Sequence, residues 1–309
     1  MSLSRLAEEY LQSLTAAGCS PYTIRNRRCH LRRFLSHMES VNVTEAHTLR
    51  RESIEDFVDM LCWEATKRTG LPMKVTTRNV RLRSIRSFAR WLYEHDHVNH
   101  DCAAEVSYAR EPMTLPRNVL DEKGMQKLLA APDAQTPLGY RDKTILEILY
   151  ATAMRVGELT GLDVGDVDID AGVALIRHGK WHKDRVVPMG RRASATVASY
   201  IAGVRGELAL NDESALIVSY KGRRLSRESV GNLVRSYAKR QGLAGKVTPH
   251  SLRHACATHM MRRGAPIRHV QELLGHADIK TTEIYTHLTS QELCNAHAKY
   301  HPREQEGAP

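Results

Sequence analysis

The segment "TPHSLRHACATHMMRRG", residues 248–264, reads as a helix with a well-marked beginning. Thr248 is a favourable capping residue, and Pro249 suits the first helical turn. His250 and Arg253 are three residues apart, so their side chains share one face near the start of the helix. Helix N-termini attract anions through free N–H groups and the helix dipole. An imidazole and a guanidinium at this place predict a binding site for a phosphate.

A metal site is the competing interpretation of the same segment. His250 and His254 have the i, i+4 spacing of paired metal ligands. The segment lacks the glutamate of the H-E-x-x-H pattern, offers no obvious third ligand, and places Arg253 beside the histidines. We therefore expect neither a metal nor a cofactor.

Two further cationic residues, Arg155 and Lys180, lie at the end of a predicted helix and in a predicted turn. Arg155 follows the strongly apolar segment "YRDKTILEILYATAM", which predicts a core helix. The alternative for Arg155 is an ion pair with Glu158, which contributes little if it is exposed. Lys180 lies in the turn of a hairpin predicted from "VDIDAGVALIRHGKWHKDRVVPMG", with Lys183 as the competing lysine. Turn lysines are usually just solvated.

The segment "GHADIKTTEIYTHL", residues 275–288, places Tyr285 among threonines, nine residues after His276. A surface tyrosine is the ordinary interpretation. Tyr300 is the alternative if a tyrosine carries chemistry.

Composition favours a polyanionic partner. The 309 residues carry a net charge of +10, and the pI is about 9.4. The six cysteines form no C-x-x-C pair, and neither a targeting segment nor an apolar run long enough to span a membrane is visible. We expect a cytoplasmic protein that binds DNA or RNA and no membrane.

The pattern of elements predicts a mainly α protein with a small antiparallel β-sheet. Residues 1–108 are expected to form a helical bundle, residues 109–118 a proline-containing linker, and residues 119–309 a second domain. The fourth helix of the bundle is expected to bury Val80, Ile85, Phe88, Trp91 and Leu92. Exposed arginines on two bundle helices predict contacts with phosphates: Arg25, Arg28, Arg32, Arg33, Arg78, Arg81, Arg83, Arg86 and Arg90.

Taken together, five separated elements resemble the tyrosine recombinases, or phage-integrase-type recombinases. They are Arg155, Lys180, "HSLRH" (250–254), "LLGHADI" (273–279) and "TTEIYTHL" (281–288), in the order that the family shows. The resemblance covers nearly the whole chain. It implies an N-terminal helical core-binding (SAM-like) bundle and a C-terminal α+β catalytic domain.

The resemblance also implies a role for each residue. Tyr285 would attack a DNA phosphodiester and form a 3′-phosphotyrosyl bond, while Arg155 and Arg253 hold the non-bridging oxygens. Lys180 would protonate the leaving 5′-oxygen. His250 would assist proton transfer at the tyrosine, and His276 would add a hydrogen bond. A phenol with a pKa near 10 needs such a cationic field to act at neutral pH, and no metal or ATP is then required.

Three departures from the family pattern are visible, one of them Asp101-Cys102 in place of the usual Asn-Pro after the fourth helix. Ala153-Met154 replaces the usual Gly-Leu before the first arginine, and we expect a packing change of little consequence. The hairpin lacks the second glycine of G-K-G-x-K, so we expect the turn that carries Lys180 to differ from the family's turn.

The C-terminal segment "THLTSQELCNAHAKYHPRE" resembles Xer-type recombinases, whose last helix docks on a neighbouring protomer. Leu288, Leu293 and Ala296 would supply the apolar face, and docking on its own core is the alternative. The resemblance implies a homo-tetramer, or a hetero-tetramer with a paralogous recombinase, on double-stranded DNA core sites, with strand exchange through a Holliday junction. It implies dimer resolution, integration or cointegrate resolution. DNA relaxation like that of a type IB topoisomerase is the alternative activity.

Overall fold

Helices begin where the sequence supplies capping side chains. The Ser20 hydroxyl accepts a hydrogen bond from the Thr23 N–H at 3.2 Å, and Pro21 occupies the first helical position, as predicted. Thr248 and Ser251 form a reciprocal capping box, because each side chain accepts from the other residue's N–H, at 3.3 and 3.1 Å. The predicted beginnings of both helices are confirmed.

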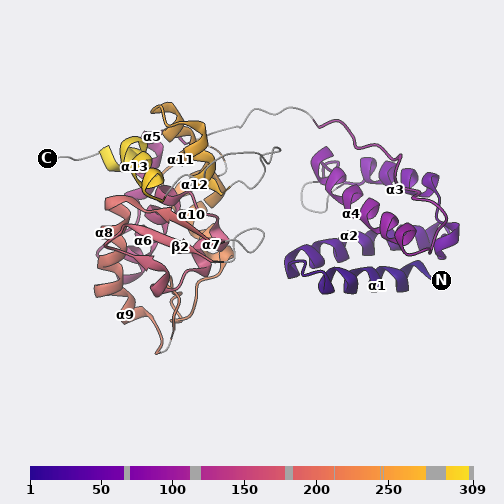
Figure 1. Cartoon of the computed structure of the whole chain (residues 1–309), viewed down its shortest axis with the longest axis horizontal. Coiled ribbons are helices and arrows are strands. Elements are labelled where there is room, and N and C mark those ends of the chain that lie inside the picture. Colours follow the sequence, from indigo (N-terminus) through magenta and orange to yellow (C-terminus); the bar gives the residue numbers. More distant parts are fainter. Residues whose placement is uncertain are drawn as a thin grey trace. The chain divides into compact units, whose positions relative to one another are not determined.

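The computed structural model describes residues 1–65, 70–111, 120–177, 184–211, 213–243, 245, 247–275 and 290–305. They belong to two units, Met1–Leu115 and Pro116–Pro309 (Figure 1). The division falls inside the segment that we expect to be a linker.

The N-terminal unit is a helical bundle around one apolar core. Its elements are α1 (Leu3–Ala16), α2 (Pro21–Ser40), the short 3-10 helix η1 (Ala46–Thr48), α3 (Arg51–Trp63) and α4 (Val75–Glu94). Tyr10, Phe34, Phe57 and Phe88 are fully buried between these helices. The Tyr10 hydroxyl also donates to Ser87 at 2.8 Å, which fixes α1 to α4. The predicted helical bundle is confirmed.

One predicted core position of this bundle is wrong. Val80 is 45% exposed, whereas Leu82, Ile85 and Leu92 on the same helix are buried. Because a helix turns about 100° per residue, Val80 lies well off the stripe that these buried residues define. Val80 therefore lies on the solvent side of α4.

The C-terminal unit packs helices around α6 and a small sheet. Its elements are α5 (Glu122–Leu129), α6 (Pro137–Thr152), α7 (Val156–Gly161), η2 (Val164–Asp166), β1 (Val167–Asp168), β2 (Val173–Ile176), β3 (Arg185–Pro188), α8 (Gly190–Ser199), the π-helical η4 (Tyr200–Val204), α9 (Arg205–Leu208), α10 (Arg227–Arg240), α11 (Pro249–Arg262), α12 (Ile267–Leu274), α13 (Ser290–Tyr300) and α14 (Pro302–Gln305). The strands are antiparallel in the order β1-β2-β3. Val173 pairs with Pro188 and Ile176 pairs with Arg185. The mainly α fold with a small antiparallel sheet is confirmed.

Helix α6 is the centre of this unit because it is buried on nearly every side. Ile145, Leu146, Ile148 and Leu149 are all inaccessible to solvent. Helices α8 and α11 pack on α6, and Figure 1 shows α6 surrounded by the other elements of the unit. A helix buried on all sides must find hydrogen-bond partners for its last carbonyl groups inside the protein.

The end of α6 obtains these partners from the C-terminal helices. His297 bonds to the Ala151 carbonyl at 2.8 Å, and His301 bonds to the Tyr150 carbonyl at 3.3 Å. The two imidazole rings are stacked with their centroids 4.4 Å apart. Arg303 pairs with Glu147 of α6 as well. Histidine side chains of α13 and of the residue after it therefore cap α6.

The same contacts place α13 on its own chain. Leu293 and Ala296 are 5% and 7% exposed and are covered by the C-terminal unit itself, while Leu288 lies outside the described residues. This structure therefore shows the own-core alternative, because the α6 carbonyls bind the α13 histidines. Docking on a neighbouring protomer stays a prediction.

The expectation that Ala153 is a harmless packing change needs correction. Ala153 ends α6 in the left-handed conformation, with φ 51° and ψ 21°, and it is fully buried. A side chain costs about 1–2 kcal/mol in this conformation, which glycine adopts freely. The alanine therefore adds backbone strain immediately before Met154 and Arg155.

Lowering the pH should destabilise the C-terminal unit. Burial lowers the pKa of His297 and of His301 below their usual value of 6.5. The unfolded chain then binds more protons than the folded one below pH 6.5, so stability is complete above that pH and falls as the pH drops. Each histidine contributes up to about 1.4 kcal/mol per pH unit.

Urea denaturation between about pH 7.5 and about pH 5.5 measures this effect. His297→Gln should flatten the pH dependence, whereas His254→Gln, at an exposed position, should leave it unchanged. Equal pH slopes for the wild type and His297→Gln would rule out the His297 imidazole as a cause.

Glycine substitutions test the strained end of α6. Ala151→Gly should cost about 2 kcal/mol, because it removes a buried methyl group inside a helix. Ala153→Gly should be nearly neutral, because the relief of strain offsets the lost methyl group. Ala151 is the matched control, since it is 1% exposed on the same helix. Equal losses of unfolding free energy in urea would show that Ala153 is unstrained.

Candidate active site

Arg155 stands in the gap between α6 and α7. It is the residue before the first turn of α7, and its side chain is 39% exposed. Glu158 holds it twice: the carboxylate accepts from the Arg155 N–H at 2.7 Å and from Nη1 at 3.0 Å. The ion pair with Glu158 that we weighed as an alternative is therefore present, and because the Glu158 side chain is only 11% exposed it is not a weak surface contact. The backbone and the side chain of Arg155 are thus fixed by one carboxylate.

Arg253 is a buried cation beneath this gap. It is 5% exposed, and its guanidinium donates to the Ala153 carbonyl at 2.6 Å and to the Leu274 carbonyl at 2.5 Å. Burial, together with the smaller effects of the Arg155 and Arg185 charges, lowers the pKa of Arg253 to about 10. Arg253 therefore stays protonated at neutral pH while lying in the field of two other guanidiniums.

His250 lies one turn before Arg253 on α11 and is exposed. The capping box already occupies the Ser251 N–H with the Thr248 hydroxyl. Part of the anion site that we predicted at this helix start is therefore taken by the protein itself. The charge of Arg155 acts on Arg253, and His250 stands at the solvent-facing start of the same helix as Arg253.

Arg185 is a site residue that the sequence interpretation missed. Its guanidinium binds both oxygens of Glu158, at 2.9 and 2.8 Å. Burial raises the pKa of Glu158, but hydrogen bonds from Arg185 and Arg155 outweigh this effect, and the pKa lies below its usual value. Arg185 lies two residues before the fully buried Val187 on β3, and residues two apart in a strand share a face. Strand periodicity would therefore have placed Arg185 on the inner face.

A fourth guanidinium reaches the same helix end. Arg227, at the first residue of α10, packs so closely on Gly157 that an added Cβ there would lie 2.8 Å from its Cζ atom. The cationic neighbourhood of Arg155 thus draws on α7, β3, α10 and α11.

Three predicted site residues lie outside the described part of the chain: Lys180, His276 and Tyr285. Their positions stay predictions. The described chain leads up to His276 at Gly275, which ends α12 in the left-handed conformation with φ 59°.

Other tyrosines are poorly placed to act as nucleophiles. The Tyr150 hydroxyl is buried and bonded to His259 at 2.9 Å. The Tyr237 hydroxyl donates to Asp142 at 2.9 Å. Burial and the Asp142 charge raise the pKa of Tyr237 to about 12. Tyr300 is partly buried against the core.

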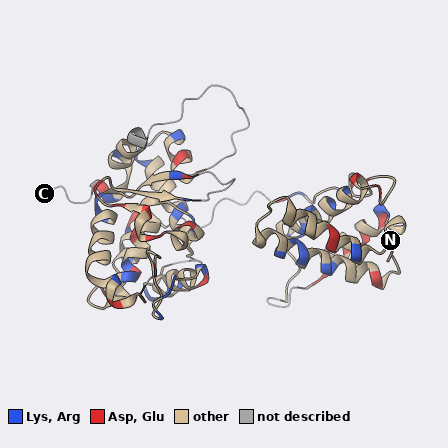
Figure 2. Cartoon of the chain, turned by 60° about the horizontal axis from the view of Figure 1, so that its bottom comes forward, with Lys and Arg blue, Asp and Glu red and all other residues tan. Residues whose placement is uncertain are grey.

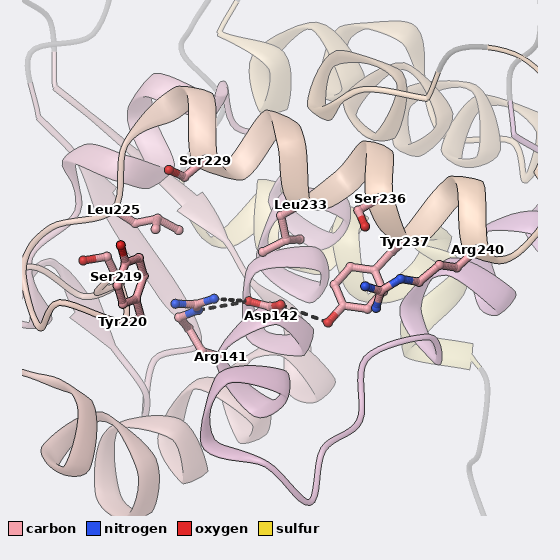
Figure 3. Close-up of a pocket in the computed structure, with 10 residues that line it drawn as sticks. All are labelled: Arg141, Asp142, Ser219, Tyr220, Leu225, Ser229, Leu233, Ser236, Tyr237 and Arg240. Carbon is pink, nitrogen blue, oxygen red and sulfur yellow. Dashed lines mark hydrogen bonds and ion pairs between the residues drawn. The ribbon is translucent and has the colours of Figure 1, made fainter.

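A cavity of about 260 Å³ near Tyr237 is lined by a cluster of polar side chains that bond to one another (Figure 3). Arg141 donates to Asp142 at 3.0 and 2.6 Å and to the Val218 carbonyl at 3.2 Å. Figure 3 shows Asp142 between Arg141 and Tyr237, which joins α6 to α10. Arg141, Asp142 and Tyr237 already satisfy one another, and Arg240 lies over the Tyr237 ring, so we do not assign this cavity a ligand.

The N-terminal unit offers a second cationic surface. Five of the nine arginines of the predicted faces have partners within the unit: Arg28 pairs with Glu8, Arg33 with Glu64 and Arg90 with Glu94, Arg86 bonds to backbone carbonyls, and Arg78 bonds to the Cys62 sulfur. Arg25 and Arg32 on α2, and Arg83 on α4, are exposed. Figure 2 shows basic residues along the helices of this unit. The surface available to phosphates is thus narrower than the sequence suggested.

Among the residues that the structure describes, no group of three His, Cys, Asp or Glu side chains converges on a point where a metal would bind. Within the same ranges, every helix is too short or too polar to cross a membrane.

Comparison with known proteins gives a consistent result. Residues 118–292 match the phage integrase family, and residues 7–96 match the phage integrase N-terminal SAM-like domain. The chain is 36% identical to tyrosine recombinase XerC 2 of Ralstonia nicotianae, over 97% of this chain and 86% of that protein. It is 34% identical to tyrosine recombinase XerD of Listeria monocytogenes, over 97% of this chain and all of that protein.

A solved structure shows the same fold. A lambda integrase dimer bound to a COC′ core site matches with a TM-score of 0.70 at 16% identity, over 94% of this chain and all of that chain. The fold, the clustered arginines and the similarity along the whole chain agree: this protein belongs to the phage integrase family of tyrosine recombinases.

Proposed function

We propose that this protein cuts and rejoins DNA at specific sites through a covalent bond to Tyr285. The buried Arg253, with the partly exposed Arg155 close enough for their charges to interact, is the observation that carries the proposal, together with family membership. The charges of the two guanidiniums repel each other, and Glu158 forms its ion pair with Arg155 alone of the two. A DNA phosphate would supply a further anion between them, and its charge grows as the phosphorus becomes five-coordinate.

In the proposed reaction the Tyr285 oxygen attacks the phosphorus and loses its proton with the help of His250. The bond from phosphorus to the 5′-oxygen breaks, and Lys180 gives that oxygen a proton. Arg155 and Arg253 bind the non-bridging oxygens, and His276 donates a further hydrogen bond. The 3′-phosphotyrosyl bond keeps the energy of the broken ester, so a 5′-hydroxyl from a partner strand reverses the step without ATP. The guanidiniums supply the charge that a metal would otherwise bring.

Assembly on DNA follows from the same proposal. The lambda integrase of similar fold is a dimer on its core site. We propose dimers of this protein on each core site and a tetramer, of this chain alone or with a paralogous recombinase, for strand exchange through a Holliday junction. Such a protein would work in the cytoplasm. The described relatives are recombinases and an integrase, which favours recombination over the topoisomerase alternative.

Covalent trapping tests the proposal. The protein is incubated with a library of nicked duplexes, in which the cut fragment diffuses away and the adduct accumulates, in the presence of EDTA. The wild type should form an adduct whose peptide contains Tyr285, and Tyr285→Phe should form none. Arg253→Lys should lower the rate about a hundred- to thousandfold, because lysine cannot make both guanidinium contacts.

Tyr300→Phe is the matched control, since it removes the other candidate hydroxyl and should trap DNA like the wild type. An adduct that persists in Tyr285→Phe, or a strict need for a divalent ion, would overturn the proposal.

A further inference from the structure

Arg185 lies between two parts of the candidate site that are far apart in the sequence. On one side its guanidinium binds Glu158 of α7. On the other side it lies against Gly275, at the end of α12. Its side chain is 19% exposed, so these contacts take place away from bulk water.

On the first side, Arg185 helps Glu158 to hold Arg155. One carboxylate oxygen accepts Nη1 of Arg155 at 3.0 Å and Nη1 of Arg185 at 2.9 Å. The other accepts the Arg155 N–H at 2.7 Å and Nη2 of Arg185 at 2.8 Å. Two parallel bonds from a planar guanidinium fix the plane of the carboxylate. That plane sets the direction in which Glu158 presents its oxygen to the Arg155 side chain.

On the second side, Arg185 limits the path of the chain at Gly275. A Cβ added to Gly275 would lie 2.8 Å from Nε and 2.9 Å from Cζ of Arg185. Arg253 binds the carbonyl of the preceding residue, Leu274, at 2.5 Å. Two guanidiniums therefore fix the end of α12, one residue before His276.

We propose that Arg185 is a positioning residue for DNA cleavage, which orients Arg155 through Glu158 and sets the backbone path at Gly275. This inference rests on the proposed function. Arg185 acts through these two contacts and does not itself bind the phosphate. Lysine at this position would keep the charge and lose the paired hydrogen bonds.

A double-mutant cycle tests the route through Arg155. Arg185→Lys should lower the single-turnover rate of adduct formation about a hundredfold at unchanged DNA affinity, because misplacing a catalytic group by about 1 Å has that effect. In an Arg155→Lys background the same substitution should cost much less, because the group that it positions is already missing. Arg263→Lys is the control: it alters an ion pair with Glu122 at 2.8 Å elsewhere in the unit.

A pair of glycine substitutions tests the route through Gly275. Gly275→Ala places a methyl group against the Arg185 guanidinium and should slow adduct formation. Gly242→Ala is the matched control, since Gly242 has φ 61° against 59° for Gly275 and nothing within 4 Å of an added Cβ. Both variants carry the same backbone strain, so a difference in rate reports the contact with Arg185.

The outcomes separate this inference from the proposed function. If the wild type forms no adduct at Tyr285, the proposed function fails. If the wild type reacts, Arg155→Lys is impaired, and Arg185→Lys reacts like the wild type, only the inference fails. The inference would also be overturned if the rate reductions of Arg155→Lys and Arg185→Lys multiplied in the double variant and Arg185→Lys lowered the thermal stability of the protein. That result would indicate a purely structural role for Arg185.

Discussion

The Glu158 carboxylate is the anion on which the candidate site depends. It receives four hydrogen bonds from Arg155 and Arg185, next to the buried Arg253. Three guanidiniums cannot share a partly buried space without compensation, and this single negative charge only partly provides it. The site therefore retains an excess of positive charge, and the charges of Arg155 and Arg185 add to burial in lowering the pKa of Arg253. That excess is what a phosphate and its transition state would neutralise.

The end of α6 connects this charge cluster to the C-terminal helices. Its last carbonyls bind His301, His297 and, one residue beyond the helix, Arg253. Any movement of α13 away from α6 would expose those carbonyls and disturb the helix end that leads into Arg155. If α13 docks on a neighbouring protomer, as we expect from the family, the partner would have to leave these bonds intact or replace them. A change in the position of α13 on assembly would thus affect the placement of Arg155 through the C-terminal end of α6.

Much of the fold was predictable because local signals agreed with burial. Ser20, Thr248 and the apolar stripe of α6 lie where propensity and packing favour the same structure. Arg155 and Arg253 were predictable from their spacing and the family resemblance. Val80 was misplaced because one apolar residue does not define a helix face. The strain at Ala153 depends on a dihedral angle, and the role of Arg185 depends on a contact 27 residues away in sequence, which local patterns do not reveal.

The most direct measurement of the central claim is the single-turnover cleavage rate of Glu158→Gln in EDTA, with Glu122→Gln as the control for loss of an ion-paired glutamate. Glutamine keeps the shape of the side chain and removes the charge that holds the guanidiniums. We predict a rate about a hundredfold below that of the wild type, with unchanged DNA affinity, because the arginines lose their orientation. Cleavage by Glu158→Gln at the wild-type rate would contradict the account.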